Sequence, residues 1–230
     1  MRKLAFLLCV ALWSGLATAG YDEAWAAYDK GDFKTATKEF QKLAKQGDAT
    51  AQYNLGVMYF KGQGVPQSYK TAIEWYRKAA DQGDAGAQLN LGVMYSLEQG
   101  VPHDYALAAE WYLKAAGQGD MTAQYNLGVM YVNGQGVPRD YKLAMGWFSK
   151  AAEQGDATAL YNLGVMYMKG DGVSQDYAQA HQWLSLAAAS GNKDAVGIRD
   201  LLAGKMTASQ IEEAGRLARA WSAQHTKGEP

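Results

Sequence analysis

Three histidines offer the most direct route to acid–base or metal chemistry in this sequence, because imidazole titrates near neutral pH and binds metal ions. They are His103, His181 and His225, and they stand far apart in the chain. None has another histidine or a cysteine at a spacing typical of a metal site, and the single cysteine is Cys9. The sequence therefore predicts no metal site, no cofactor and no catalytic residues.

A serine and a lysine three positions apart, Ser190 and Lys193, match a motif of penicillin-recognising enzymes. That motif needs one helix to carry both residues. Here Gly191 lies between them and is expected to end a helix, and the sequence has no Ser-Asp-Asn or Lys-Thr-Gly segment. We interpret the match as coincidental. The alternative hypothesis is a protein that binds or hydrolyses β-lactams or cell-wall material.

A row of tryptophans and a row of asparagines recur at constant spacing, and both could contact ligands. Tryptophan rings can stack on carbohydrate, but the tryptophans of this row share their helix with small alanines, which favours packing in a core. The asparagines could contact a peptide, although a ladder of hydrogen bonds to backbone groups between helices is the favoured interpretation. The tryptophans are Trp75, Trp111, Trp147 and Trp183, and the asparagines are Asn54, Asn90, Asn126 and Asn162. A glycan-binding surface is the third hypothesis.

Both rows belong to a repeat of 36 residues. The segment AQYNLGVMY at Ala51 returns almost unchanged at Ala87, Ala123 and Ala159, so the starting positions differ by 36 each time. A Gly-Asp pair precedes each copy, with glycine suited to ending one helix and aspartate to capping the next. In the first copy the pattern predicts helix A over residues 49–60 and helix B over residues 69–80. Stacked helix pairs would bury one another's apolar faces as an all-α solenoid.

Glycines in the middle of helix A and in the loops add detail to this prediction. A mid-helix glycine costs about 1 kcal/mol relative to alanine. Its recurrence at Gly56, Gly92, Gly128 and Gly164 therefore indicates close approach of two helices. The loop after helix A departs from its pattern at Glu98, which replaces a glycine, and at Ser174, which replaces a proline. We expect both loops to differ locally, with backbone strain at Glu98.

The first 19 residues have the features of a secretory signal. Arg2 and Lys3 precede an apolar run that is too short to span a membrane, and Ala17-Thr18-Ala19 fits a cleavage site. Cleavage between Ala19 and Gly20 would place the mature protein in the periplasm or outside the cell. It would also remove Cys9 and two of the 22 basic residues, leaving 20 against 23 acidic residues, a net charge of −3. Nucleic acid and anionic membranes are therefore not expected as partners, and no stable membrane insertion is expected after cleavage.

The ends of the repeat array are expected to differ from its interior because they face water. Residues 20–46 predict a helix pair in phase with the repeats, and residues 192–230 predict capping helices with a tail. A helix over residues 192–203 precedes a capping box of Thr207 and Gln210. An apolar stripe of Ile211, Ala214, Leu217, Ala218 and Trp221 could then close the stack. The predicted repeats are residues 47–82, 83–118, 119–154 and 155–191.

The recurring pattern GDAxAQYNLGVMY, followed by GxGV, DY, WY and KAA, resembles the Sel-one-like repeat of the tetratricopeptide superfamily. The resemblance covers residues 47–191. It implies a right-handed superhelical α-solenoid of antiparallel helix pairs, which generally serves as a non-catalytic adaptor for proteins or peptides. Some relatives are described as acting on β-lactams. One exported subgroup has a disulfide in each repeat, and the mature chain has no cysteine for one.

The same resemblance implies that helix A lines the concave face of the superhelix and would contact a protein or peptide partner. The alternative is that these tyrosines and valines pack between adjacent A helices. The oligomeric state is left open. The candidate partner-binding residues, all assigned by this analogy, are Tyr53, Val57, Phe60, Lys61, Leu89, Val93, Ser96, Tyr125, Val129, Val132, Tyr161, Val165, Met168 and Lys169.

Overall fold

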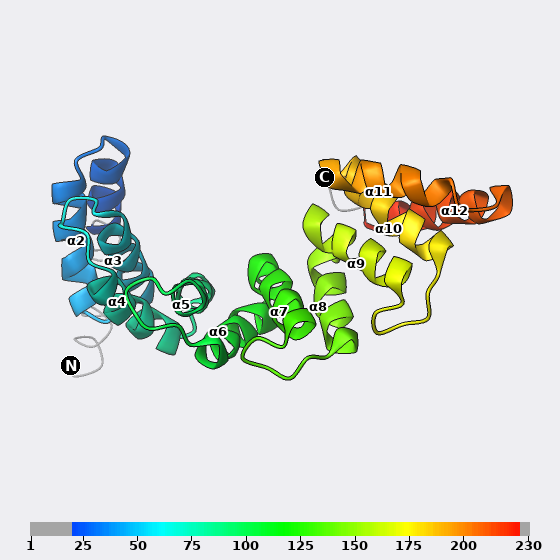
Figure 1. The fold of residues 1–230 in the computed structure, drawn as a ribbon. Helices are drawn as coiled ribbons and strands as arrows, with labels where there is room; N and C mark the ends of the chain where they lie inside the picture. Colours follow the sequence, from blue (N-terminus) through cyan, green and yellow to red (C-terminus); the bar gives the residue numbers. More distant parts are fainter. Residues whose placement is uncertain (1–19, 226–230) are drawn as a thin grey trace, which may run out of the picture. The chain divides into compact units, whose positions relative to one another are not determined.

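The computed structural model describes residues 20–225, and this part of the chain consists of helices and the turns that join them (Figure 1). The signal sequence predicted at residues 1–19 lies outside the described residues. Residues 20–29 are helical. They are followed by α2 (Phe33–Lys45), α3 (Ala49–Lys61), α4 (Tyr69–Asp81), α5 (Ala85–Ser96), α6 (Tyr105–Gly117), α7 (Met121–Asn133), α8 (Tyr141–Glu153), α9 (Ala157–Lys169), α10 (Tyr177–Ala189), α11 (Lys193–Ala203) and α12 (Ala208–His225).

The chain divides into two compact units, an N-terminal unit that ends at Trp111 and a C-terminal unit that begins at Tyr112. Within the N-terminal unit, α3 packs against both α2 and α4, and α4 packs against α5. Within the C-terminal unit, α7 to α10 each pack on the next helix, and α12 packs on α10. Contacts between elements adjacent in sequence define a solenoid, so the expected all-α solenoid of antiparallel helix pairs is confirmed. No helix within residues 20–225 is long and apolar enough to cross a membrane.

The Gly-Asp pairs delimit the helices as the sequence predicts. Gly47 has a φ of +97°, a left-handed conformation that glycine adopts without steric cost. The carboxylate of Asp48 then accepts a hydrogen bond from the Ala51 N–H at 2.8 Å. Asp84, Asp120 and Asp156 cap α5, α7 and α9 in the same way. These caps satisfy backbone donors that a helix leaves unpaired at its start, and they fix where each helix A begins.

The glycines in the middle of helix A mark the points of closest approach between the two helices of a pair. A Cβ atom added to Gly56 would lie 2.5 Å from the Tyr76 ring, and one added to Gly128 would lie 2.5 Å from Phe148 Cε1. The same atom on Gly164 would lie 2.7 Å from Leu184 Cγ. These distances are shorter than any normal carbon–carbon contact, so the prediction that glycine permits close helix packing is confirmed.

A row of buried glutamines joins consecutive helices. Gln52, Gln88 and Gln124 are each 5% exposed. Their side-chain amides donate to the carbonyl oxygens of Ala44, Ala80 and Ala116 at 3.2, 3.1 and 3.3 Å. Each acceptor lies near the end of the preceding helix, where carbonyl groups lack intrahelical partners. The ladder that the sequence assigned to asparagines is therefore made by glutamines two positions earlier, and that part of the prediction was wrong.

The two irregular loops behave differently from each other. Glu98 has a φ of +56° and is the non-glycine residue with positive φ in the described part of the chain, which confirms the expected strain. The Ser174 loop keeps the geometry of a proline-containing one, so the expected difference there was wrong. Gln175 Nε2 donates to the Met168 carbonyl at 2.7 Å, as Gln67 Nε2 donates to that of Phe60 at 2.8 Å. Serine can adopt the backbone conformation that proline imposes.

The C-terminal helix closes the stack with only part of its predicted stripe. Ala214 is fully buried, and Ala218 and Trp221 pack against the core cluster of the C-terminal unit. Ile211 is 38% exposed, so its assignment to the buried stripe was wrong. It lies in the first turn of α12. The capping box is confirmed, since the Thr207 N–H donates to Gln210 Oε1 at 2.9 Å.

We predict that Gly128→Ala lowers the free energy of unfolding by about 1–3 kcal/mol, because the added methyl group would overlap the Phe148 ring. Gly146→Ala is the matched control. Gly146 lies in α8, is exposed, and has nothing within 4 Å of an added Cβ. That control should gain about 0.5–1 kcal/mol from helix propensity. Urea denaturation of the two variants measures both changes, and equal effects would contradict the close-packing role.

Candidate partner-binding surfaces

The residues assigned to partner binding lie in rows on the A helices of both units. We call these rows the A-helix faces. The aromatic and aliphatic members are all half-buried, and the two lysines, Lys61 and Lys169, are exposed. In the N-terminal unit the face consists of Tyr53, Val57, Phe60, Lys61, Leu89, Val93 and Ser96. In the C-terminal unit it consists of Tyr125, Val129, Val132, Tyr161, Val165, Met168 and Lys169. A half-buried apolar side chain is held in place by the core and still has surface to offer.

Aromatic contacts hold several of these side chains in place from below. The ring of Tyr53 lies 6.0 Å from the ring of Tyr76, and that of Tyr125 lies 5.8 Å from Phe148. Tyr53 also touches the start of α5, because a Cβ on Gly86 would lie 3.1 Å from its Cε2 atom. Tyr53 therefore packs between adjacent A helices, as the alternative interpretation proposed, whereas the contact shown for Tyr125 is with helix B of its own repeat. Both tyrosines remain half-buried.

A small pocket opens on the A-helix face of the N-terminal unit. It has an empty volume of about 200 Å³ and is lined by Phe60, Tyr76, Asn90, Val93 and Met94. Burial raises the pKa of the Tyr76 phenol, and the Asn90 side-chain amide hydrogen-bonds its hydroxyl group. Asn90 therefore bridges helices A and B of adjacent repeats through a side chain. We call this site the N-terminal pocket.

The tryptophan row only partly fills the core. Trp111 is buried, whereas Trp75 and Trp147 are half-buried, and the fully buried aromatic position is the next one, occupied by Tyr76 and Phe148. The Lys78 ammonium lies 4.1 Å from the centre of the Trp75 ring. The ammonium of Lys150 lies 4.2 Å from the Trp147 ring in the same arrangement. A lysine covers the ring face that a sugar would need, which disfavours glycan stacking on these two tryptophans.

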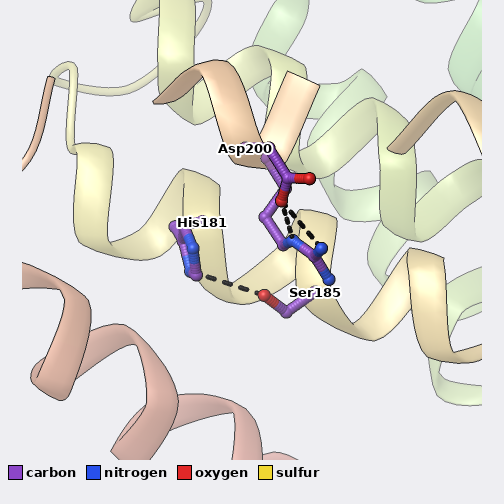
Figure 2. A network of polar contacts seen from close by, with 4 residues as sticks. His181, Ser185 and Asp200 are labelled. Atoms are coloured by element: carbon purple, nitrogen blue, oxygen red, sulfur yellow. Dashed lines mark hydrogen bonds and ion pairs between the residues drawn. The ribbon is translucent and has the colours of Figure 1, made fainter. Parts of the chain in front are cut away.

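Two pairs of polar residues lie near each other, one pair on α10 and one on α11 (Figure 2). His181 Nδ1 lies 3.4 Å from Ser185 Oγ, and Asp200 accepts from the Arg199 guanidinium at 2.7 and 2.9 Å. In a serine–histidine–aspartate triad the acid hydrogen-bonds the imidazole directly. Here Asp200 pairs with Arg199 instead, so these residues do not form such a triad. Burial lowers the pKa of His181, the Arg199 charge lowers it further, and Asp200 partly opposes the shift.

The Ser190–Lys193 match is also explained by the fold. Ser190 is the C-cap of α10, and Lys193 is the first residue of α11. Asn192, between them, caps α11 by accepting from the Ala195 N–H at 3.0 Å. Gly191 ends the first helix as expected, with a φ of +92°. The serine and the lysine therefore lie on two different helix ends.

A second pocket, which the repeat pattern did not predict, lies in the C-terminal unit. Its empty volume is about 530 Å³, and it lies between the end of α9, the start of α10 and α11. It is lined by Met168, Tyr177, Ile198, Leu201, Leu202 and Lys205. The sequence contains a signal for it, because Leu201 follows Val165 by 36 residues and Ile198 follows Asn162 by 36 residues. We call this site the C-terminal pocket.

Residues 20–225 contain no group of three residues that could hold a metal ion.

The comparisons with known proteins agree with this architecture. The sequence model of the Sel1 repeat matches residues 49–84, 85–120, 122–156 and 157–192. The chain therefore belongs to the Sel1 repeat family, whose members are generally non-catalytic scaffolds that bind other proteins. No curated protein matches the sequence significantly.

Solved structures of similar proteins share the fold. The protective antigen c5321 of uropathogenic Escherichia coli, which displays an SLR fold, is 38% identical with a TM-score of 0.74. That match covers 83% of this chain and 41% of the antigen, so this chain spans less than half of its length. A Sel1 repeat protein from Oxalobacter formigenes is 30% identical with a TM-score of 0.74, over 87% of this chain and 84% of that one. A putative Sel1 repeat protein from Klebsiella pneumoniae is 25% identical with a TM-score of 0.50, over 83% and 94%.

We predict that His181 makes the protein less stable as the pH falls. The unfolded chain binds a proton near the ordinary histidine pKa of about 6.5, whereas folded His181 resists protonation until a lower pH. Stability should therefore decrease as the pH drops from about 7.5 to 5.5, and His181→Asn should show a shallower decrease. Urea denaturation at several pH values measures both slopes. The control is His103→Asn, in an exposed loop, and an equal change of slope there would contradict the assignment.

Proposed function

We propose that this protein is an exported, non-catalytic scaffold that binds another protein or an extended peptide through its A-helix faces. The observation that carries the proposal is that tyrosine and valine recur on these faces, half-buried, in both units. Tyrosine combines a large apolar area with a polar tip and loses little side-chain entropy on binding, which makes it a frequent anchor at interfaces. Membership of a family of protein-binding scaffolds supports the same function.

The composition of the A-helix faces suits a polypeptide better than a small molecule. The third row differs from repeat to repeat, as Phe60, Ser96, Val132 and Met168, whereas the fully buried Leu55, Leu91, Leu127 and Leu163 are identical. A position needed only for stacking would be expected to repeat. A position that contacts different parts of a partner is free to vary. The exposed lysines at the ends of α3 and α9 would then guide polar groups of the partner.

The alternative, action on β-lactams or cell-wall material, has less support. It rests on Ser190 and Lys193, which lie at the ends of two helices and not on one helical turn. The hydrogen-bond partner of His181 is Ser185, and no carboxylate within residues 20–225 accepts a hydrogen bond from the imidazole. A fluorescent penicillin that labels the purified protein covalently, with loss of the label in Ser190→Ala, would favour this alternative over the scaffold.

We predict that the double variant Tyr125→Ala and Val129→Ala weakens partner binding at least about tenfold, because interface anchors commonly contribute more than 1 kcal/mol each. The partner is first isolated from the cell envelope by affinity capture with the wild-type protein. Its affinity for purified wild type and variant is then measured by calorimetry. Both substituted residues are only half-buried, so the variant should remain folded, which circular dichroism can verify.

The matched control is Lys142→Ala with Leu143→Ala on α8. Both residues are exposed and belong to helix B, away from the A-helix face. This control should bind the partner like the wild type. Equal affinities of all three proteins would contradict the A-helix face as the binding surface, whereas equal losses in both variants would indicate a general loss of stability.

We also propose that the protein is exported and begins at Gly20 after cleavage. The basic start, the apolar run and the Ala17-Thr18-Ala19 site support this localisation. Mass spectrometry of the protein recovered outside the cytoplasm should find Gly20 at its N-terminus. Ala19→Leu should block cleavage, because signal peptidases need a small residue there, and Thr18→Val should not. Recovery of the uncleaved wild-type chain from the cytoplasm would contradict export.

A further inference from the structure

The C-terminal pocket occupies the same place between repeats as the N-terminal pocket, three repeats later. Adding 108 to Phe60, Val93 and Met94 gives Met168, Leu201 and Leu202. The two pockets nevertheless differ in size, with empty volumes of about 200 and 530 Å³. The residues at equivalent positions therefore decide what each pocket could bind.

The C-terminal pocket is larger and more apolar, and its surroundings differ from those of the N-terminal pocket at two equivalent positions. Tyr76 and Asn90 both line the N-terminal pocket, and the Asn90 side chain hydrogen-bonds the Tyr76 hydroxyl group. The equivalent residues, again 108 positions later, are Leu184 and Ile198. Neither carries a polar group. Ile198 lines the C-terminal pocket, whereas Leu184 is fully buried and does not, so this polar pair has no counterpart there.

Leu201 marks this pocket as a surface that another molecule covers. It is 75% exposed, the largest value among the exposed large apolar side chains of the described residues. It extends the row Val57, Val93, Val129 and Val165 of the A-helix faces by one repeat. The C-terminal pocket is open, and Leu201 projects from it into water. A polypeptide could cover this leucine, whereas a small molecule inside the pocket would leave it exposed.

The charges around the pocket favour an acidic partner. Lys205 is the charged residue in the lining, and Lys169 follows the lining residue Met168. Neither lysine forms an ion pair within residues 20–225. Two of the carboxylates near the lining are already engaged. Asp200 pairs with Arg199, and the Asp176 carboxylate caps the first turn of α10.

We infer that the C-terminal pocket binds a peptide segment of the partner in which a large apolar side chain lies beside a carboxylate. The apolar side chain enters between Met168, Ile198 and Leu201, and the carboxylate meets Lys205. This inference rests on the proposed scaffold function and adds the chemistry of the segment that is bound. It also places an anchor site in the capping helix α11, beyond the four matched repeats.

The test uses the full-length mature protein and short fluorescent peptides in three compositions: leucines beside aspartates, leucines beside lysines, and serines beside aspartates. Fluorescence anisotropy should show binding of the leucine–aspartate peptide only. Leu201→Ser should weaken this binding at least about tenfold, as expected for loss of a leucine contact. Lys205→Glu should reverse the preference, so that the leucine–lysine peptide binds better. This reversal is a result that a loss of folding could not produce.

The control variant is Leu143→Ser, which removes a 47% exposed leucine of the same unit from α8 and should leave peptide binding unchanged. Equal binding of all three peptides, or of none, would overturn the inference. A concentration-dependent dimer in sedimentation analysis that Leu201→Ser abolishes would identify a second copy as the occupant and would also overturn it. If Tyr125→Ala with Val129→Ala loses the partner while Leu201→Ser and Lys205→Glu keep it, the scaffold function stands and this inference fails.

Discussion

The contact between a glycine on helix A and a large side chain on helix B underlies the rest of this structure. Gly56, Gly128 and Gly164 leave no room for even a methyl group against Tyr76, Phe148 and Leu184. The two helices of a pair therefore touch through backbone on one side and a ring or a leucine on the other. On its other side, helix A is joined to the preceding helix by buried glutamines, which reach carbonyl groups eight residues earlier in the chain.

Because the same contacts recur, the array can vary at its surface without losing its packing. The buried leucine of helix A is identical in all four repeats. The half-buried position near the end of helix A differs in each repeat, as Phe60, Ser96, Val132 and Met168. The two pockets extend this principle. Leu184 and Ile198 stand where Tyr76 and Asn90 stand three repeats earlier, and the C-terminal pocket is the larger of the two. Function in such a scaffold thus arises from the positions where one repeat differs from another.

Much of this could be read from the sequence, because repetition itself carries structural information. Helices predicted over residues 49–60 and 69–80 are observed as Ala49–Lys61 and Tyr69–Asp81, and the aspartate caps are where they were expected. The asparagine and tryptophan assignments share one cause. Glutamine and asparagine stand two positions apart in helix A, and tryptophan and tyrosine are neighbours in helix B. The rotation of each helix about its axis decides which of them faces the core, and periodicity alone does not resolve that rotation. The C-terminal pocket escaped notice because the repeat pattern fades after Gly191.

The sequence by itself determined the fold class, the repeat length, the helix ends and the family. Each of these follows from local conformational preferences that recur at the same positions in every repeat. It also indicated which helix faces have apolar residues to offer. Tertiary structure alone decided that glutamines satisfy the helix-end carbonyls, that lysines cover Trp75 and Trp147, and that an apolar basin opens beside Lys205. Those features depend on the space between helices, and that space is set by how side chains from separate repeats fit together.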